Sequence, residues 1–149
     1  ARGFKAEDFA RSHPGGALGR KLLTHVSDVM RSGDAVPRVD PDATFNELMK
    51  QISAKSVGAT AIVSPTNHVL GIFTDGDLRR LIEKGFDLRQ VSAKEVMHTS
   101  PRTIRVNELA AMAAEMMETH SITSILVLDA DDKLCGIVHI SDLMRAKVI

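Results

Sequence analysis

The sequence contains no tryptophan and no tyrosine, and its five phenylalanines leave it with only 3% aromatic residues of that class. A planar ligand would therefore have to rest mostly against aliphatic side chains and backbone. The single cysteine, Cys135, excludes an internal disulfide framework. One unpaired cysteine is typical of a protein from a reducing compartment, so we expect a cytoplasmic protein.

The sequence also lacks an excess of either charge, because 19 basic residues balance 19 acidic ones. This balance argues against a nucleic-acid partner, which usually requires a basic surface. No apolar run approaches the roughly 18 residues that span a bilayer, so no membrane partner is expected. The six histidines show no metal-binding spacing, and we predict no metal site.

What the sequence does contain is an internal repeat. Asp28-Val29-Met30 recurs as Glu95-Val96-Met97, and the run from Gly71 to Leu78 recurs 65 residues later as the run from Gly136 to Leu143. The same spacing of 65 relates many further apolar positions. Such a constant spacing indicates a duplicated structural unit.

Each copy predicts the same order of elements. Apolar residues at helical spacing predict one helix, and two short apolar runs separated by turn residues predict a pair of strands. The fold class is therefore α+β, with two β-α-β-β-α units. The predicted elements are short strands around Val39 and Ile104, helices at 43–55 and 107–120, strands at 59–63, 69–73, 125–128 and 134–138, and closing helices near Asp77 and Asp142.

A unit of about 60 residues buries too little surface to be comfortably stable alone. We therefore expect the two units to pack their sheets together around a pseudo-twofold axis. That arrangement would create two equivalent clefts where the units meet.

The repeat resembles the CBS domain, over about residues 25–149. The Val-Met pair, the Gly71-Ile72-Phe73-Thr74-x-x-Asp77-Leu78 run and the element order carry the resemblance. It implies a Bateman module, in which two CBS domains commonly bind adenine nucleotides or related ligands and signal to an attached domain. The expected division is a leader at 1–23, a first CBS unit at 24–90 and a second at 91–149.

The leader contains Ser12-His13-Pro14-Gly15-Gly16, which on its residues alone reads as a tight turn into a helix. The stretch from Phe9 to Arg20 also resembles the end of the sugar-isomerase (SIS) domain of arabinose-5-phosphate isomerases. The resemblance implies a parent enzyme that interconverts ribulose 5-phosphate and arabinose 5-phosphate by proton transfer through an enediol. It places His13 in the catalytic set, the SIS domain as a partner, and no required cofactor; this chain alone should be inactive.

Thr74 and Asp77 lie where a predicted strand meets a helix. A hydroxyl and a carboxylate at this spacing can cap the helix. They can equally bind a nucleotide, because Asp77 could accept from two ribose hydroxyls while Thr74 and helix N–H groups donate to phosphate.

In the second copy His139 replaces Thr74, whereas Asp142 keeps the place of Asp77. His139 is either a partly buried residue at a strand end or a donor to an anionic ligand, and it makes the two clefts unlike. Arg79 and Arg80 read either as a solvated helix face or as phosphate contacts. The remaining candidate ligand contacts, by their place in the repeat, are Arg38, Thr103 and Thr60.

The leading hypothesis is a regulatory module whose effector is AMP, ATP or CMP-Kdo. Kdo is an eight-carbon acidic sugar of bacterial lipopolysaccharide that is made from arabinose 5-phosphate, and CMP-Kdo is its activated form. A second hypothesis is a ligand-free assembly module. Self-association is expected in either case, and Met112, Met116 and Met117 are candidate core or contact residues. A third, the CBS module of a transporter or transcription regulator, is disfavoured by the leader.

Overall fold

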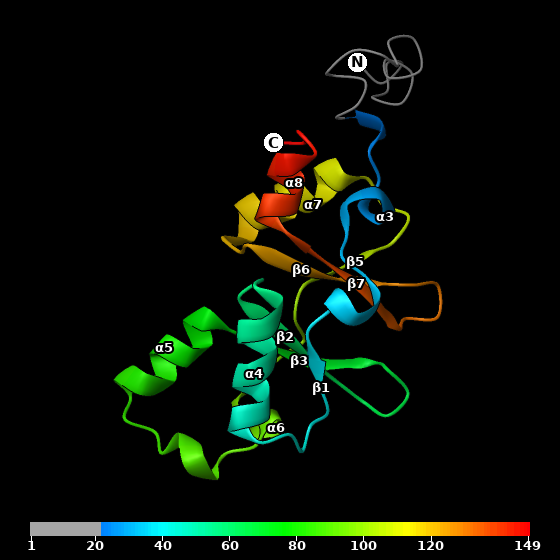
Figure 1. The fold of residues 1–149 in the computed structure, drawn as a ribbon. Helices are drawn as coiled ribbons and strands as arrows, with labels where there is room; N and C mark the ends of the chain where they lie inside the picture. Colours follow the sequence, from blue (N-terminus) through cyan, green and yellow to red (C-terminus); the bar gives the residue numbers. More distant parts are fainter. Residues whose placement is uncertain (1–21) are drawn as a thin grey trace.

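A computed structural model describes residues 22–149 and has two halves, each a small sheet covered by helices (Figure 1). The first half contains β1 (Arg38–Val39), α4 (Phe45–Lys55), β2 (Ala59–Val63), β3 (Val69–Thr74) and α5 (Asp75–Glu83). The second contains β5 (Thr103–Arg105), α7 (Ala110–His120), β6 (Ser124–Leu128), β7 (Leu134–His139) and α8 (Ile140–Arg145). Short helices α3 (Val26–Val29) and α6 (Ala93–Val96), 3-10 turns at Gly33–Ala35 and Leu88–Gln90, and strand β4 (His98–Thr99) complete the described fold.

The strand register repeats from one half to the other. In each sheet the first strand runs parallel to the second, and the second runs antiparallel to the third. Arg38 pairs with Ala61, and their counterparts 65 residues later, Thr103 and Leu126, also pair. Each sheet also has a register shift at the same place in its second strand. The prediction of a duplicated β-α-β-β-α unit is confirmed.

The two halves are related by a twofold axis that passes close to the hairpin turns. There His68 forms an antiparallel bridge with Lys133, which is its own counterpart in the repeat. A contact between a position and its own copy arises where a twofold axis passes. Asn67 strengthens the contact, because its side-chain amide donates to the Leu134 carbonyl over 2.8 Å and its own carbonyl accepts from the Leu134 N–H over 3.0 Å.

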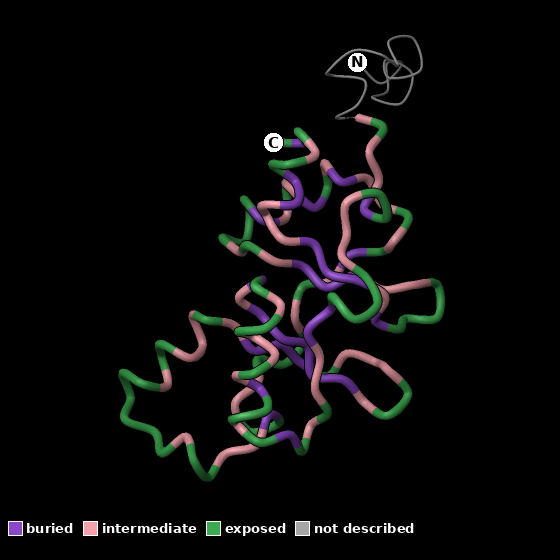
Figure 2. The backbone as a smooth tube through the Cα atoms, in the orientation of Figure 1, coloured by how far each residue is buried: buried purple, intermediate pink, exposed green. Residues whose placement is uncertain are grey.

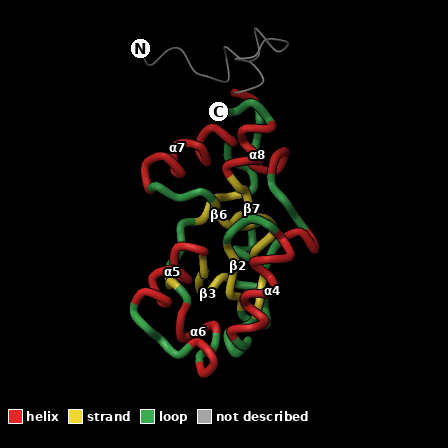
Figure 3. Tube along the Cα trace, turned by 60° about the vertical axis from the view of Figure 1, so that its left-hand side comes forward, coloured by secondary structure: helices red, strands yellow, loops and turns green. Residues whose placement is uncertain are grey.

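The strands separate a core that both halves share from two further cores, each of which lies between the sheet and the helices of one half. Along β2, alternate residues face opposite sides: Ala61 packs toward the other half, whereas Ile62 packs with Phe73 against the helices of its own half. Figure 2 shows the buried residues following the strands at the middle of the molecule, and Figure 3 shows the helices outside them. The shared core contains Val36, Val57, Ala59, Ala61, Val63, Ile72, Leu126, Leu134 and Ile137.

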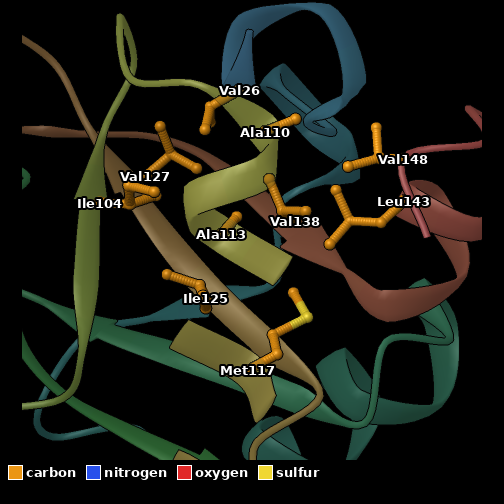
Figure 4. Close-up of a cluster of buried hydrophobic side chains, with 10 residues drawn as sticks. All are labelled: Val26, Ile104, Ala110, Ala113, Met117, Ile125, Val127, Val138, Leu143 and Val148. Atoms are coloured by element: carbon orange, nitrogen blue, oxygen red, sulfur yellow. The ribbon is translucent and has the colours of Figure 1, made fainter. Parts of the chain in front are cut away.

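The short leading helices pack across the axis, each against the opposite half. Val26 of α3 is buried with Ala110 and Leu143 in the second half (Figure 4). Ala93 of α6 is buried in the first half, where its N–H donates to the Ala43 carbonyl over 2.9 Å. The predicted units, 24–90 and 91–149, are therefore continuous in sequence, but the first segment of each unit packs on the other half of the structure.

This exchange explains the paired glycines of the repeat. A Cβ at Gly71 would lie 2.6 Å from Met97 Sδ, and one at Gly136 would lie 2.5 Å from Met30 Sδ. Both distances are too short for a real side chain. The segment at Met97 can therefore pass close to β3, and the segment at Met30 close to β7, only because the strand has glycine at the crossing point.

Candidate functional site

A cleft of about 1170 Å³ lies between the two halves. The first half contributes residues 56–59 at the start of β2, together with the end of β3 and the beginning of α5. The second half contributes residues 100–103 before and at β5, residues 120–124 between α7 and β6, and His139.

Thr74 and Asp77 line this cleft and form a capping box at the start of α5. Asp77 Oδ2 accepts from the Thr74 N–H over 2.9 Å and from the Thr74 hydroxyl over 3.0 Å, and the Asp77 N–H donates to Thr74 Oγ1 over 3.2 Å. Asp77 Oδ1 accepts from Arg80 Nη2 over 2.6 Å. The capping interpretation of this pair is therefore confirmed. The Asp77 side chain is still 18% exposed, which leaves its carboxylate within reach of a ligand.

His139 takes over the capping role at the start of α8. Its Nδ1 accepts from the Ser141 N–H over 3.1 Å, so the neutral ring carries its proton on Nε2. Burial lowers the pKa of His139, and the positive charge of Arg31 adds to that effect while Asp142 opposes it. A histidine can therefore replace the threonine as a cap, provided that it stays neutral. His139 also lines the cleft.

Asp142 lies in a different setting from its counterpart Asp77. Its side chain is only 4% exposed, and its carboxylate accepts from the His139 N–H over 3.0 Å. Arg31 Nε donates to both carboxylate oxygens over 3.1 and 3.3 Å, and Arg145 Nη1 donates over 3.2 Å. Burial acts to raise the pKa of Asp142, but the Arg31 hydrogen bond and the other donors outweigh it and leave the pKa below its usual value.

The other predicted site residues divide between the cleft and its surroundings. Thr103 lines the cleft together with Thr74, Asp77 and His139. Arg38 points elsewhere, since its Nη1 donates to Asn67 Oδ1 over 2.9 Å at the hairpin turn. Two further candidates are not brought into the cleft: Asp142, which is paired with Arg31, and Thr60, which is fully buried on β2 with no partner for its hydroxyl among the described residues. His13 lies outside the described residues.

Basic side chains from both halves line the cleft together with Asp77. Arg79 and Arg80 come from α5, and both line it rather than only facing solvent. The second half adds Arg102, and histidines at 98, 120 and 139 complete the set against the carboxylates of Asp75 and Asp77. Such a lining suits an anionic ligand with hydroxyl groups, because arginine donates to phosphate or carboxylate and aspartate accepts from hydroxyls.

The sequence reasoning missed Arg31, Arg102 and His120. Arg102 and His120 precede β5 and end α7, so they reach the Asp77 cleft only through the packing of the two halves. Arg31 directly follows the first Val-Met pair, and its position in the repeat is the signal that could have singled it out. Within residues 22–149, no three metal-binding side chains gather, and no helix is long and apolar enough to cross a membrane.

Comparison with known proteins assigns both halves to one domain family. The sequence profile of the CBS domain matches residues 26–84 and 93–149. Over its whole length the chain is 49% identical to the arabinose 5-phosphate isomerase KdsD of Salmonella typhi, and it spans 45% of that relative.

Solved CBS structures have the same fold. A CBS domain protein from Pyrobaculum aerophilum complexed with AMP matches with a TM-score of 0.71 at 21% identity, covering 80% of this chain and 89% of that one. The CBS domain pair of protein MJ0100, in complex with 5′-methylthioadenosine and S-adenosyl-L-methionine, matches with a TM-score of 0.72 at 20% identity, covering 82% and 94%. With the CBS profile on both halves and the fold in agreement, the chain belongs to the CBS domain family.

Proposed function

We propose that this chain is the nucleotide-sensing regulatory part of an arabinose 5-phosphate isomerase, and that its cleft binds an effector nucleotide or nucleotide-sugar. The proposal rests first on the 49% identity to an isomerase of which the chain spans 45%. The rest of such a protein would hold the isomerase domain. The ribulose 5-phosphate to arabinose 5-phosphate conversion would then take place outside the CBS pair, which controls it.

The observation that carries the proposal is the position of Asp77. Its carboxylate is partly exposed at the first turn of α5, inside a cleft whose lining also holds Arg79, Arg80 and Arg102. A ribose can donate two hydroxyls to one carboxylate, and a phosphate can accept from arginine and from N–H groups at the start of a helix. The related CBS structures complexed with AMP, or with 5′-methylthioadenosine and S-adenosyl-L-methionine, support a nucleoside ligand.

Among nucleotides, CMP-Kdo fits the charges of the cleft beside AMP and ATP. It carries a ribose for Asp77, and its phosphate and carboxylate are two anionic groups for the cleft-lining arginines Arg80 and Arg102, which come from different halves. Kdo is made from arabinose 5-phosphate, so its activated form would act as a feedback signal. No Trp or Tyr is available for stacking, and the base would contact aliphatic and backbone groups instead.

Self-association is the second candidate function, and exposed methionines on the second half favour it. Met112 on α7 is 45% exposed and Met144 on α8 is 59% exposed, whereas Met117 is buried in the core. Exposed apolar side chains on adjoining helices can pack against a second copy. Sedimentation at micromolar concentration should then show a dimer or larger species, and a strict monomer would remove this candidate.

Calorimetric titration of the chain with CMP-Kdo, AMP, ATP and 2′-deoxy-AMP tests the main proposal. At least one ribonucleotide should bind, and 2′-deoxy-AMP should bind more weakly than AMP because it donates one hydroxyl fewer to Asp77. Absence of binding by every ribonucleotide at millimolar concentration would refute nucleotide sensing and leave the assembly function.

A further inference from the structure

Arg31 and His98 occupy the same structural position in the two halves. Each directly follows a Val-Met pair of the repeat. Arg31 forms an antiparallel bridge with Ile137, and His98 pairs with Ile72, which is the counterpart of Ile137 65 residues earlier. His98 lines the cleft that contains Asp77, and the twofold axis places Arg31 at the equivalent region beside Asp142, which we call the second cleft.

The carboxylates that these two residues approach are otherwise held alike. Asp77 accepts from the Thr74 N–H and from Arg80, and Asp142 accepts from the His139 N–H and from Arg145. Both sets of donors are counterparts in the repeat. Two differences remain: Asp77 also accepts from the Thr74 hydroxyl, and Asp142 accepts a pair of hydrogen bonds from Arg31, for which no counterpart is found on Asp77 among residues 22–149.

Arg31 bridges the two halves at the second cleft. Its Nε lies 3.1 Å from Asp142 Oδ2, and its Nη1 donates over 3.3 Å to the Lys55 carbonyl at the end of α4 in the first half. The guanidinium thus joins the carboxylate of one half to the backbone of the other. The result is visible in exposure: the Asp142 side chain is 4% exposed, against 18% for Asp77.

We propose that Arg31 is a built-in occupant of the second cleft, so that the CBS pair binds one nucleotide and not two. The guanidinium takes the carboxylate oxygens that a ribose would need, and it is held there by both halves. His98 at the equivalent place is exposed and lines the open cleft. The inference rests on the proposed nucleotide binding and adds which of the two clefts is used and what closes the other.

Two reciprocal substitutions test the proposal. Arg31→His gives the second cleft the residue found at the first, and His98→Arg gives the first cleft the residue that closes the second. Arg145→Ala is the control, because this exposed arginine also contacts Asp142 but does not reach the first half. Each protein is titrated with AMP and with CMP, by calorimetry for stoichiometry and by amide NMR for the location of binding at Asp77 or Asp142.

The wild type and Arg145→Ala should bind one nucleotide per chain, with shifts near Asp77. Arg31→His should gain a second site with shifts at Asp142, and His98→Arg should bind at least tenfold more weakly. Two sites in the wild type, or an Arg31→His protein that is folded and still binds at Asp77 alone, would overturn the inference while the proposed function stands.

If Arg31→His does not fold, His98→Arg decides, because its site is exposed; undiminished binding by that variant would overturn the inference. A wild type that binds neither AMP nor CMP, together with an Arg31→His variant that binds at Asp142, would refute binding at Asp77 and support the role of Arg31. Failure of both proteins to bind would refute both.

Discussion

Arg31 and Asp142, 111 residues apart in the chain, are joined by a guanidinium nitrogen that donates to both oxygens of one carboxylate over 3.1 and 3.3 Å. The contact exists because the first Val-Met segment crosses the twofold axis and packs on the second half. At the equivalent place in the other half, His98 pairs with Ile72, and Asp77 stays partly exposed. Two repeats with the same strand order therefore hold their equivalent aspartates in different surroundings.

Asp142→Asn should lower stability most at neutral pH. The folded pKa of Asp142 lies below its usual value, because Arg31 and the other donors outweigh burial. The ion pair therefore contributes fully above about pH 3.9, the pKa of an unperturbed aspartate, and its contribution is lost as pH falls through the lower folded value. Breaking a buried ion pair costs about 3–5 kcal/mol. Since Arg31 is 25% exposed, we expect the lower end of that range in urea unfolding at pH 7.

The control for this prediction is Asp87→Asn, which removes an exposed ion pair with Arg89 and should have a far smaller effect. The difference between wild type and Asp142→Asn should shrink when unfolding is measured near pH 3. An equal difference at both pH values would contradict the role assigned to the charge on Asp142.

His139 should make the protein less stable in mild acid. Burial and Arg31 lower the pKa of His139, so the unfolded chain takes up a proton near pH 6.5 while the folded chain does not. Stability is therefore full above that pH and falls as pH decreases toward the folded value. His139→Thr, the residue of the first copy, keeps a capping side chain and should lose part of this dependence. Thermal unfolding from pH 7.5 to pH 5 measures it, and identical curves for both proteins would refute the prediction.

Gly136→Ala should be destabilising by about 1–3 kcal/mol, the usual cost of overpacking a well-packed site. The new Cβ would lie 2.5 Å from Met30 Sδ and 2.9 Å from the Arg31 carbonyl, and the backbone oxygen cannot move away without breaking the bridge to Ile137. Gly76→Ala is the matched control, because the nearest atoms lie 3.5 Å away. Urea unfolding should show the control unchanged or slightly more stable, and an equally mild effect at Gly136 would contradict the close crossing.

Much of the fold was predictable because its signals are local. The range 59–63 was predicted as a strand and is one, since an apolar run buried on both faces is typical of a central strand. The Thr74–Asp77 pair was recognised from its place at a strand–helix junction, and the structure confirms the cap there. The spacing of 65 also predicted the axis, which the bridge between His68 and Lys133 confirms.

What could not be predicted depends on contacts between segments far apart in the chain. The second long helix begins at Ala110 and not at 107, because the residues at its start pair with the segment just before α3: His25 bridges Leu109, and the Ala110 N–H donates to the Thr24 carbonyl over 2.8 Å. Strand β4 has only two exposed residues and no apolar pattern. The repeat marks the position of Arg31, but its partner Asp142 could not be predicted, because the two residues lie 111 positions apart and meet only through the exchange of the leading segments.

The effect of Asp77 on nucleotide affinity is the most direct test of the account. Asp77→Ala removes a ribose contact and also a helix cap, so a second variant must separate the two effects. Glu47→Ala is suited to this, because Glu47 closes the corresponding capping box with Thr44 at the start of α4 and does not line the cleft. Loss of either cap should cost about 1 kcal/mol of stability.

Calorimetry with the tightest-binding nucleotide, on wild type and both variants at a temperature where all are folded, completes the test. We predict that Asp77→Ala binds about 10- to 100-fold more weakly, the scale of hydrogen bonds to a charged group, while Glu47→Ala binds as the wild type does. Wild-type affinity in Asp77→Ala would show that Asp77 only caps its helix and would contradict the proposed site.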